Sequence, residues 1–230
     1  MTRLATLFAA LSLLFTTAAV ASDRPVVVEL YTSQGCSSCP PADRLLHELA
    51  EMEDVIALSL HVDYWDYLGW KDKFASPAFT KRQHNYARAL GETSVYTPQM
   101  IIGGTDHVVG SRPMKVSKLI RKHAEKQKQV DVVLQRKNDQ VMINAASAAP
   151  QDMVVYLVRY SPRETVDVRK GENRGHTLTY ANVVTDWQQV EEWDGAAPLR
   201  VSAQAAGTAP VVVIVQRKGF RDVLGAAQLR

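Results

Sequence analysis

The first half of the chain alternates between apolar runs and segments of helical periodicity. The apolar runs are short and rich in β-branched residues, which is typical of buried strands. They occupy residues 25–32, 55–62, 99–102 and 107–109. The helical segments carry apolar residues three or four positions apart. They occupy residues 40–52, 77–90 and 113–128. The predicted order is therefore βαβα followed by ββα.

From about residue 129 onward the pattern changes to short runs of strand character separated by turn signals. The predicted strands are residues 131–136, 141–145, 154–160, 165–169, 199–203 and 211–217. Ser161-Pro162 and the glycine-flanked string at 171–175 are among the predicted turns. Residues 186–193 fit either a short helix or a strand. We therefore expect an α/β chain with two domains, at 22–128 and 129–230, the second being smaller, antiparallel and sandwich-like.

The N-terminus has the pattern of a secretory signal peptide. A positive start at Arg3 precedes an apolar run from Leu4 to Val20, which ends in the small-residue box Ala19-Val20-Ala21. The alternative is a membrane anchor, because the run approaches the roughly 18 residues that could span a bilayer. We expect removal of residues 1–21 and a periplasmic or secreted protein with no membrane association after cleavage.

Charge composition narrows the possible partners. The chain has 27 basic and 24 acidic side chains, for a formal net charge of +3. No long run of like charges is present, so the sequence gives no indication of binding to nucleic acid or to an anionic membrane.

Cys36 and Cys39 are the only two cysteines of the chain. A disulfide between them would close a very short loop and remove little entropy from the unfolded chain, so its value would be chemical. Because a strand precedes the pair and Pro40 opens a helix, we expect both sulfurs at a helix N-terminus, where the dipole stabilises a thiolate. We predict Cys36 to be the exposed nucleophile and Cys39 to be the buried resolving cysteine.

Thr97-Pro98 opens the third strand of this layout. That strand should run antiparallel to the first, which brings its start to the edge where the cysteines lie. We therefore expect Pro98 beside Cys36, with a cis peptide bond that leaves the Thr97 backbone free for a substrate strand. The alternative is an ordinary trans proline at a strand edge.

Cys36-Ser37-Ser38-Cys39-Pro40 after a strand, with Thr97-Pro98 before a hairpin, resembles the thioredoxin superfamily over residues 25–128. The longer strings at 29–43, 61–66 and 171–175 are similar to a family of secreted bacterial thioredoxin-like proteins of unknown function, through the C-terminal half as well. The resemblance implies a thioredoxin-like first domain and names no reaction. Gly35 stands where thioredoxins usually have tryptophan, and two serines separate the cysteines, which leaves the direction of electron flow open.

Glu29 interrupts the first buried strand. Burial would raise the pKa of a carboxyl there, so Glu29 could exchange a proton with Cys39. Many thioredoxin-like proteins have a buried acid near this position. The alternative is that Glu29 points to an edge of the sheet or pairs with a base such as Lys71 or Arg82.

The segment 61–76 is the densest polar and aromatic stretch of the chain, and it follows the second strand at the same sheet edge. Its aromatic residues Tyr64, Trp65 and Trp70 could therefore form a substrate-contacting lid over the cysteines. The alternative is a small satellite core beneath a long loop.

The predicted function is thiol–disulfide exchange with protein thiols and disulfides, with no cofactor and no resident metal. Two other functions stay open. His61, Asp63 or His84 could join the cysteines around a metal, but two cysteines alone do not make a structural zinc site. A Cu(I) carrier would use the two thiolates, although the chain lacks a Met-rich or His-rich tract. A partner-binding module would use the second half, through residues 171–179, and keep the disulfide as a structural element.

Overall fold

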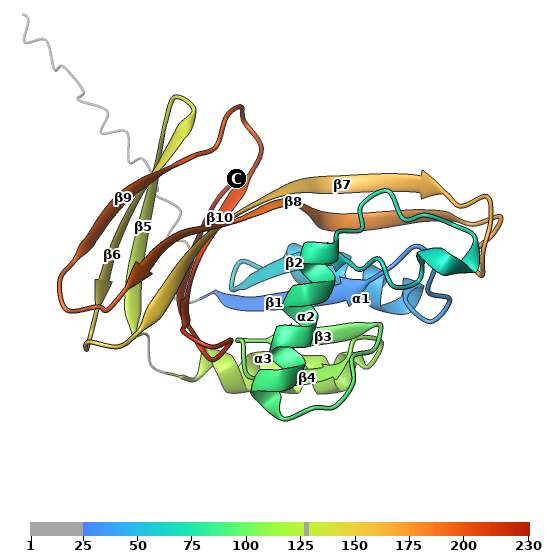
Figure 1. Ribbon diagram of the computed structural model, residues 1–230, viewed down its shortest axis with the longest axis horizontal. Helices are drawn as coiled ribbons and strands as arrows, with labels where there is room; N and C mark the ends of the chain where they lie inside the picture. The colour runs from blue at the N-terminus through green and yellow to red at the C-terminus, as the bar shows by residue number, and fades with distance from the viewer. Residues whose placement is uncertain (1–24, 127–128) are drawn as a thin grey trace, which may run out of the picture.

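The computed structural model describes residues 25–126 and 129–230 of the chain. The expected leader, residues 1–21, lies outside the described residues. Strands and helices alternate through the first half in the predicted order (Figure 1). These elements are β1 (Val26–Thr32), α1 (Pro40–Ala50), β2 (Val55–His61), the 3-10 helix η1 (Asp66–Leu68), α2 (Pro77–Leu90), β3 (Gln99–Ile102), β4 (Asp106–Val109) and α3 (Pro113–Ala124).

The second half consists of strands. They are β5 (Val130–Lys137), β6 (Gln140–Ser147), β7 (Met153–Asp167), β8 (Thr177–Trp193), β9 (Leu199–Gln204), β10 (Val211–Arg217) and β11 (Val223–Leu229). The segment 186–193, which the sequence left undecided, belongs to β8. The last strand, β11, was not predicted.

The break predicted at Ser161-Pro162 is wrong. β7 runs through both residues and pairs antiparallel with β8 along its length, so the strands predicted at 154–160 and 165–169 are one strand. On its other edge, β7 pairs with β10 only as far as Arg159. Pro162, which has no N–H to donate, lies beyond that point, where a ladder hydrogen bond on that edge is not required.

Strands from both halves form one eight-stranded mixed sheet in the order β11-β10-β7-β8-β2-β1-β3-β4. β1 pairs parallel with β2 and antiparallel with β3, so the end of β1 and the start of β3 share one edge of the sheet. β5, β6 and β9 form a separate antiparallel sheet. The predicted α/β class with a smaller antiparallel sheet is confirmed, and the domain boundary at residue 128 stays a prediction.

The helices cover opposite faces of the large sheet. Successive residues of a strand point to opposite faces, and on β1 Val28 and Leu30 pack with α1 and α3. Val27 and Tyr31 pack on the other face with α2 and with strands of the second half. The face on which a β1 side chain lies therefore decides which helix it can reach.

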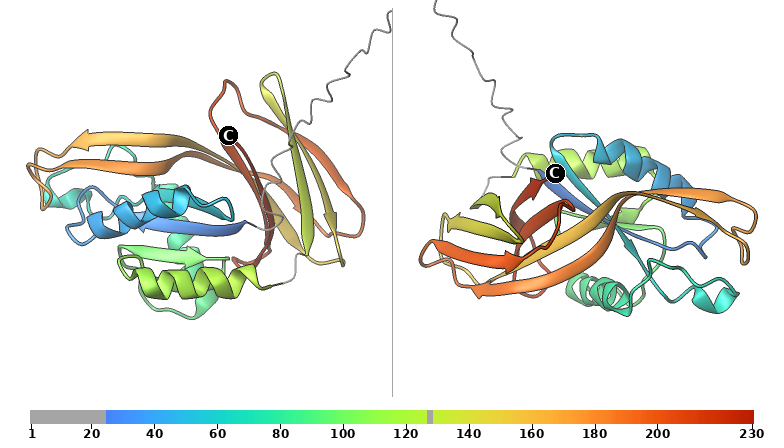
Figure 2. Two further views of the ribbon diagram at one scale, coloured as in Figure 1. Left: turned by 180° about the vertical axis from the view of Figure 1, so that it is seen from behind. Right: turned by 90° about the horizontal axis from the view of Figure 1, so that it is seen from above.

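The small sheet packs face to face on β7, β10 and β11 through a core of its own, as a sandwich does (Figure 1). The β7–β8 hairpin is much longer than this contact requires. It extends past β2 to the edge of the sheet where β1 ends (Figure 2). Within the described residues, no helix combines the length and the apolar character needed to cross a membrane.

Candidate functional site

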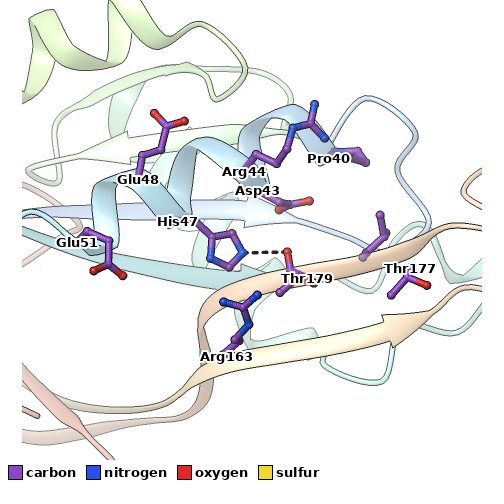
Figure 3. Close-up of a pocket in the computed structure, with 10 residues that line it drawn as sticks. Pro40, Asp43, Arg44, His47, Glu48, Glu51, Arg163, Thr177 and Thr179 are labelled. Atoms are coloured by element: carbon purple, nitrogen blue, oxygen red, sulfur yellow. Dashed lines mark hydrogen bonds between the residues drawn. The ribbon is translucent and has the colours of Figure 1, made fainter.

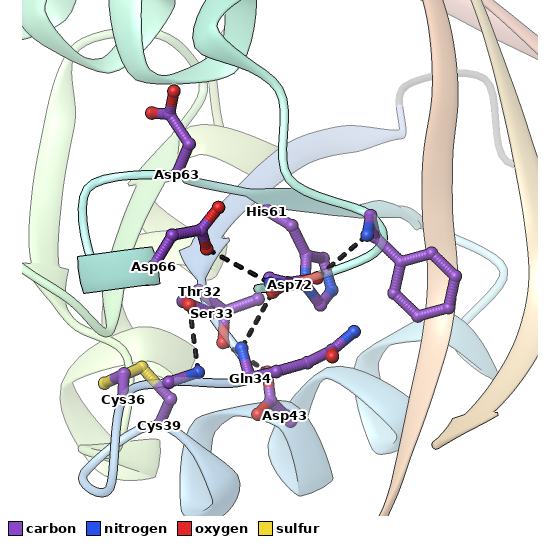
Figure 4. Close-up of polar contacts among 12 residues, drawn as sticks. Thr32, Ser33, Gln34, Cys36, Cys39, Asp43, His61, Asp63, Asp66 and Asp72 are labelled. Carbon is purple, nitrogen blue, oxygen red and sulfur yellow. Dashed lines mark hydrogen bonds and ion pairs between the residues drawn. A yellow bond between two sulfur atoms is a disulfide. The ribbon is translucent and has the colours of Figure 1, made fainter. Parts of the chain in front are cut away.

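The two cysteines form a disulfide at the junction between β1 and α1 (Figure 4). Residues 33–35 turn the chain after β1, and Cys39 is the N-cap of α1, with Pro40 at the start of the helix. The Cys39 carbonyl accepts hydrogen bonds from the N–H groups of Ala42 and Asp43, which begin the helical ladder. The pair therefore lies at the positive end of the α1 dipole, where the sequence placed it.

The segment before β3 lies against the first cysteine. The Thr97–Pro98 peptide bond is cis, as expected. The Thr97 hydroxyl donates to the Cys36 sulfur at 3.2 Å and accepts a hydrogen bond from Trp65 Nε1 at 2.7 Å. An indole N–H can only donate, so the Thr97 proton is left free to point at the sulfur. The structure thus brings Thr97, Pro98 and Cys36 together across the sheet edge.

The expected exposure of Cys36 is wrong for the disulfide form. Cys36 is 2 % exposed and Cys39 is fully buried. The reason is that segments distant in the sequence pack over the turn that carries Cys36. The neighbouring Ser37 and Ser38 are both exposed. The Ser38 hydroxyl also lies 3.4 Å from the Cys36 sulfur.

Two of the three aromatic residues singled out in the loop after β2 reach this turn. Trp65 packs so closely that a Cβ added to Gly35 would lie 3.1 Å from the Trp65 Cβ. Trp70 Nε1 donates to the side-chain oxygen of Gln34 at 2.8 Å. Tyr64 instead donates its hydroxyl proton to a glutamine of α2 at 3.2 Å. Trp65 and Trp70 therefore contact the cysteine turn directly, whereas Tyr64 contacts α2 and the Thr97 side chain.

Glu29 lies on the wrong face of the sheet for proton exchange with Cys39. Its carboxylate accepts hydrogen bonds from Arg82 at 2.7 and 2.8 Å and from the Tyr86 hydroxyl at 2.7 Å, both on α2. The guanidinium lies 3.9 Å from the ring centre of Trp187. Because α1 and the disulfide are on the opposite face, the structure supports the alternative pairing with Arg82 and gives the relay no support.

A buried polar cluster lies on the disulfide's face instead (Figure 4). Asp43, in the first turn of α1, accepts a hydrogen bond from the Thr32 hydroxyl at 2.8 Å. Asp72 Oδ2 lies 2.7 Å from His61 Nδ1. Burial raises the pKa of Asp43 to about 7. Burial alone would raise the pKa of Asp72 too, but His61 and neighbouring backbone N–H groups outweigh it, and the pKa is lowered.

A groove of about 590 Å³ between α1 and the β7–β8 hairpin ends at Asp43 (Figure 3). His47 Nε2 lies 3.1 Å from the Thr179 carbonyl oxygen across it. The residues that line it are Pro40, Asp43, Arg44, His47, Glu48, Glu51, Arg163, Thr177, Leu178 and Thr179. Asp43 Oδ2 has no hydrogen-bond partner among the described residues. Asp43 therefore belongs both to the buried cluster and to the lining of the groove.

Two residues that touch the cysteine turn were not predicted. The Asn173 amide donates to the carbonyl oxygens of Gln34 at 2.9 Å and Cys36 at 3.0 Å. Glu172 Oε2 accepts a hydrogen bond from the Ser37 N–H at 3.1 Å. Both belong to the tip of the β7–β8 hairpin. The polar string at 171–175 was the available signal, but the sequence does not tell which surface it meets.

Two of the three residues weighed as metal ligands, His61 and Asp63, have other partners. His61 is held by Asp72, and Asp63 accepts a hydrogen bond from the Thr80 hydroxyl at 2.5 Å. Across residues 25–126 and 129–230, no group of three or more His, Cys, Asp or Glu side chains is arranged to hold a metal ion.

Comparison with known proteins gives a family and a solved relative. The family model described as "Protein of unknown function (DUF1223)" matches residues 27–216. A crystal structure of a protein from Agrobacterium tumefaciens is similar, with 36 % sequence identity and a TM-score of 0.78. That similarity covers 91 % of this chain and 96 % of the other. No curated protein matches the chain.

Proposed function

Because the chain belongs to the DUF1223 family, whose description names no activity, we propose its function from the site itself. We propose that it is an exported thiol–disulfide oxidoreductase whose first half is thioredoxin-like. Its substrates are protein thiols and disulfides, and Cys36 and Cys39 are the redox pair. The reaction needs no cofactor, because the two sulfurs themselves take up and release the electrons.

One observation carries this proposal: the disulfide begins a helix, and a hydroxyl donates to its first sulfur. The start of α1 supplies the positive end of the helix dipole, which stabilises a thiolate. The Thr97 hydroxyl at 3.2 Å adds a hydrogen bond to the Cys36 sulfur. A disulfide of purely structural use would gain nothing from donors aimed at one of its sulfurs.

In the oxidising direction, a client thiolate attacks the Cys36 sulfur. A mixed disulfide forms, the Cys36–Cys39 bond breaks, and its electron pair leaves with Cys39, which takes up a proton. A second client thiolate then attacks the client sulfur of the mixed disulfide, and Cys36 leaves as the thiolate stabilised by the helix. The client has lost two electrons and the pair has gained them. Reduction of a client disulfide is the same sequence in reverse.

Asp43 is the best-placed proton partner for Cys39, in place of Glu29. It follows Cys39 by one helical turn, and its backbone N–H binds the Cys39 carbonyl at 3.1 Å. Its pKa of about 7 allows it to give or take a proton near neutral pH. The groove of Figure 3 connects it to solvent protons.

The aromatic loop supplies a surface for client chains beside Cys36. Tyr67 is 77 % exposed, and its ring stacks on that of Trp65, with centroids 6.4 Å apart. Trp65 itself holds the Thr97 hydroxyl. An apolar client side chain next to the reacting cysteine could pack on this exposed ring.

The burial of Cys36 requires that a client displaces the cover. That cover includes the exposed residues Ser37, Ser38 and Glu172, the Trp65 side chain packed on Gly35, and the buried amide of Asn173. A client therefore has to move the aromatic loop or the hairpin tip away from the cysteine turn.

The test is equilibration of the protein, expressed without its leader, with glutathione buffers of defined ratio, followed by alkylation and mass spectrometry. We expect a reversible two-electron couple, and Cys39→Ser should trap mixed disulfides with client proteins through Cys36. A bond that resists dithiothreitol in the folded protein would exclude the proposal. Tight Cu(I) binding by the reduced protein without thiol exchange would favour the copper carrier instead.

Export has its own test. If the leader is removed after Ala21, the mature protein isolated from its cells begins at Ser22. Recovery of the intact N-terminus in the cytosolic fraction would contradict the proposed location while leaving the thiol chemistry open.

A further inference from the structure

The tip of the β7–β8 hairpin binds the backbone on both sides of the Cys36 side chain. Asn173, which is 5 % exposed, donates to the Gln34 and Cys36 carbonyl oxygens. Glu172 accepts the N–H of Ser37, the residue that follows Cys36. These contacts join positions 135 to 139 residues apart in the sequence. The tip is therefore placed by the fold and not by any local preference of the cysteine turn.

Glu172 is a charged group that acts on the donors a thiolate would use. Backbone N–H groups in a turn are donors available to a nearby negative charge. The Ser37 N–H, which follows Cys36 directly and lies three residues before the start of α1, is one of them, and the Glu172 carboxylate already occupies it. The hydrogen bonds from Ser37 lower the pKa of Glu172, which keeps this carboxylate ionised at neutral pH.

We infer that Glu172 and Asn173 set the redox balance of the cysteine pair by holding a carboxylate beside Cys36. When the disulfide is reduced, a Cys36 thiolate meets a second negative charge and one fewer free N–H group. The reduced form is thereby disfavoured, and the disulfide is favoured. Asn173 is the positioning residue, because its two hydrogen bonds fix the tip on the turn; Glu172 supplies the charge.

The other charged groups near the turn do not duplicate this effect. Asp72 binds the Gln34 N–H from the opposite side and is paired with His61. Asp43 lies behind the turn, bound to Thr32. Asp72, His61 and Asp43 are all buried, and a substitution at the exposed Glu172 leaves them unchanged. Their effect on the pKa of the Cys36 thiol is therefore the same in wild type and in the Glu172 variants.

The inference deepens the proposed function, but the alkylation test of the inference gives a result whether or not the proposed function holds. In the Cys39→Ser background, the full chain is reduced chemically and the rate of Cys36 alkylation by iodoacetamide is measured against pH. With Glu172→Gln, which keeps the size and an acceptor oxygen but removes the charge, the thiol pKa should fall. The alkylation rate below that pKa should rise about two- to fivefold, the range of a charge acting at a helix terminus.

Two further variants separate charge from structure. Glu172→Lys should increase the rate more than Glu172→Gln, because the sign of the charge is reversed. Glu53→Gln removes one exposed carboxylate near the far end of α1 and should behave as wild type. High salt should reduce the difference between Glu172→Gln and wild type, because the charge is exposed and is screened.

The outcomes are distinct. Equal alkylation profiles for Glu172→Gln, Glu53→Gln and wild type would overturn the inference, even if the protein exchanges thiols with glutathione. If the Cys36 alkylation profile shifts in the order wild type, Glu172→Gln, Glu172→Lys, but the protein does not exchange thiols with glutathione, the inference stands and the proposed function is excluded. If both hold, Glu172→Gln in the two-cysteine protein should move the glutathione equilibrium toward the dithiol by the same factor.

Discussion

At the scale of single residues, the fold separates two buried acids by the face of the sheet they occupy. Glu29 on β1 points toward α2, where Arg82 neutralises it. Asp43 lies on the α1 side and accepts a hydrogen bond from the Thr32 hydroxyl. One carboxyl is therefore committed to an ion pair, while the other, on the α1 side, has an oxygen without a hydrogen-bond partner among the described residues.

Asp43→Asn should flatten the pH dependence of stability between about pH 4 and pH 7. The pKa of Asp43 is raised from its usual 3.8 to about 7 by burial. A raised pKa means that the folded state holds the proton more tightly, so this stabilisation is complete below about pH 4 and is lost as the pH rises through 7. The loss is up to about 4 kcal/mol. Urea unfolding of both proteins between pH 4.5 and 8 measures it.

Asp72 provides an internal control for that experiment. Its pKa is lowered, so its contribution to stability is lost as the pH falls. Because Asp72 is present in both proteins, its effect cancels in the difference between them. If the free energies of unfolding of wild type and Asp43→Asn differ by the same amount at every pH from 4.5 to 8, the raised pKa of Asp43 is contradicted.

Thr97→Val should slow the reaction of Cys36 by about three- to tenfold at neutral pH. The substitution keeps the shape but removes the hydroxyl that donates to the sulfur, and a hydrogen bond to a charged group is worth more than one to a neutral group. Alkylation rates of the reduced protein measure the change. Thr97→Ser keeps the hydroxyl and serves as the matched control; an equal loss in both variants would point to packing instead.

At the scale of elements, one buried ion pair ties α2 and β1 to strands of the second half. The Arg82 guanidinium lies against the rings of Tyr86, Tyr156, Trp187 and Phe220. It also binds the side-chain oxygen of Gln216 on β10. The Glu29–Arg82 pair thus connects the two halves of the chain through side-chain contacts.

Arg82→Met should lower the free energy of unfolding by about 3–5 kcal/mol, because it leaves the Glu29 carboxylate buried without its partner. The double variant with Glu29→Gln should recover part of that loss, because the unpaired charge is then gone. Urea unfolding of wild type, the two single variants and the double variant gives a double-mutant cycle. The alkylation rate of Cys36 should stay at the wild-type value, since the pair lies on the other face; a large change in that rate would place Glu29 back in the reaction.

The sequence predicted elements well where their signals are local. Pro77 and Gly91 bound α2, and Cys39 and Pro40 open α1, because capping and turn preferences act within a few residues. Pro162 misled the prediction, since its tolerance within β7 depends on where β10 stops. Asn173 and Glu172 could not be placed, because the pairing of β8 with β2 decides where their hairpin ends.

At the scale of the whole molecule, the two halves share a core. One buried cluster contains Ile56 and Leu58 of β2 together with Val158 of β7 and Val212 and Ile214 of β10. A fragment that ends at residue 128 would expose this face of the sheet to water. The shared core therefore calls for a direct test of whether residues 22–128 fold as a separate domain.

We expect a fragment of residues 22–128 not to fold stably, and the full chain to unfold in one cooperative transition. Circular dichroism with urea and gel filtration measure both. A soluble fragment with its own cooperative transition would establish the boundary at 128 and show that the shared core adds stability without being required.

The long sequence separation inside the site has a consequence for the way the molecule is made. A ribosome releases Cys36 before the amide that covers it, which comes 137 residues later. At 5–20 residues per second this gap lasts roughly 7 to 30 s. During that interval the Cys36 turn lacks the hydrogen bonds that Asn173 and Glu172 supply. The turn can therefore take its final packing only after the second half of the chain has been synthesised.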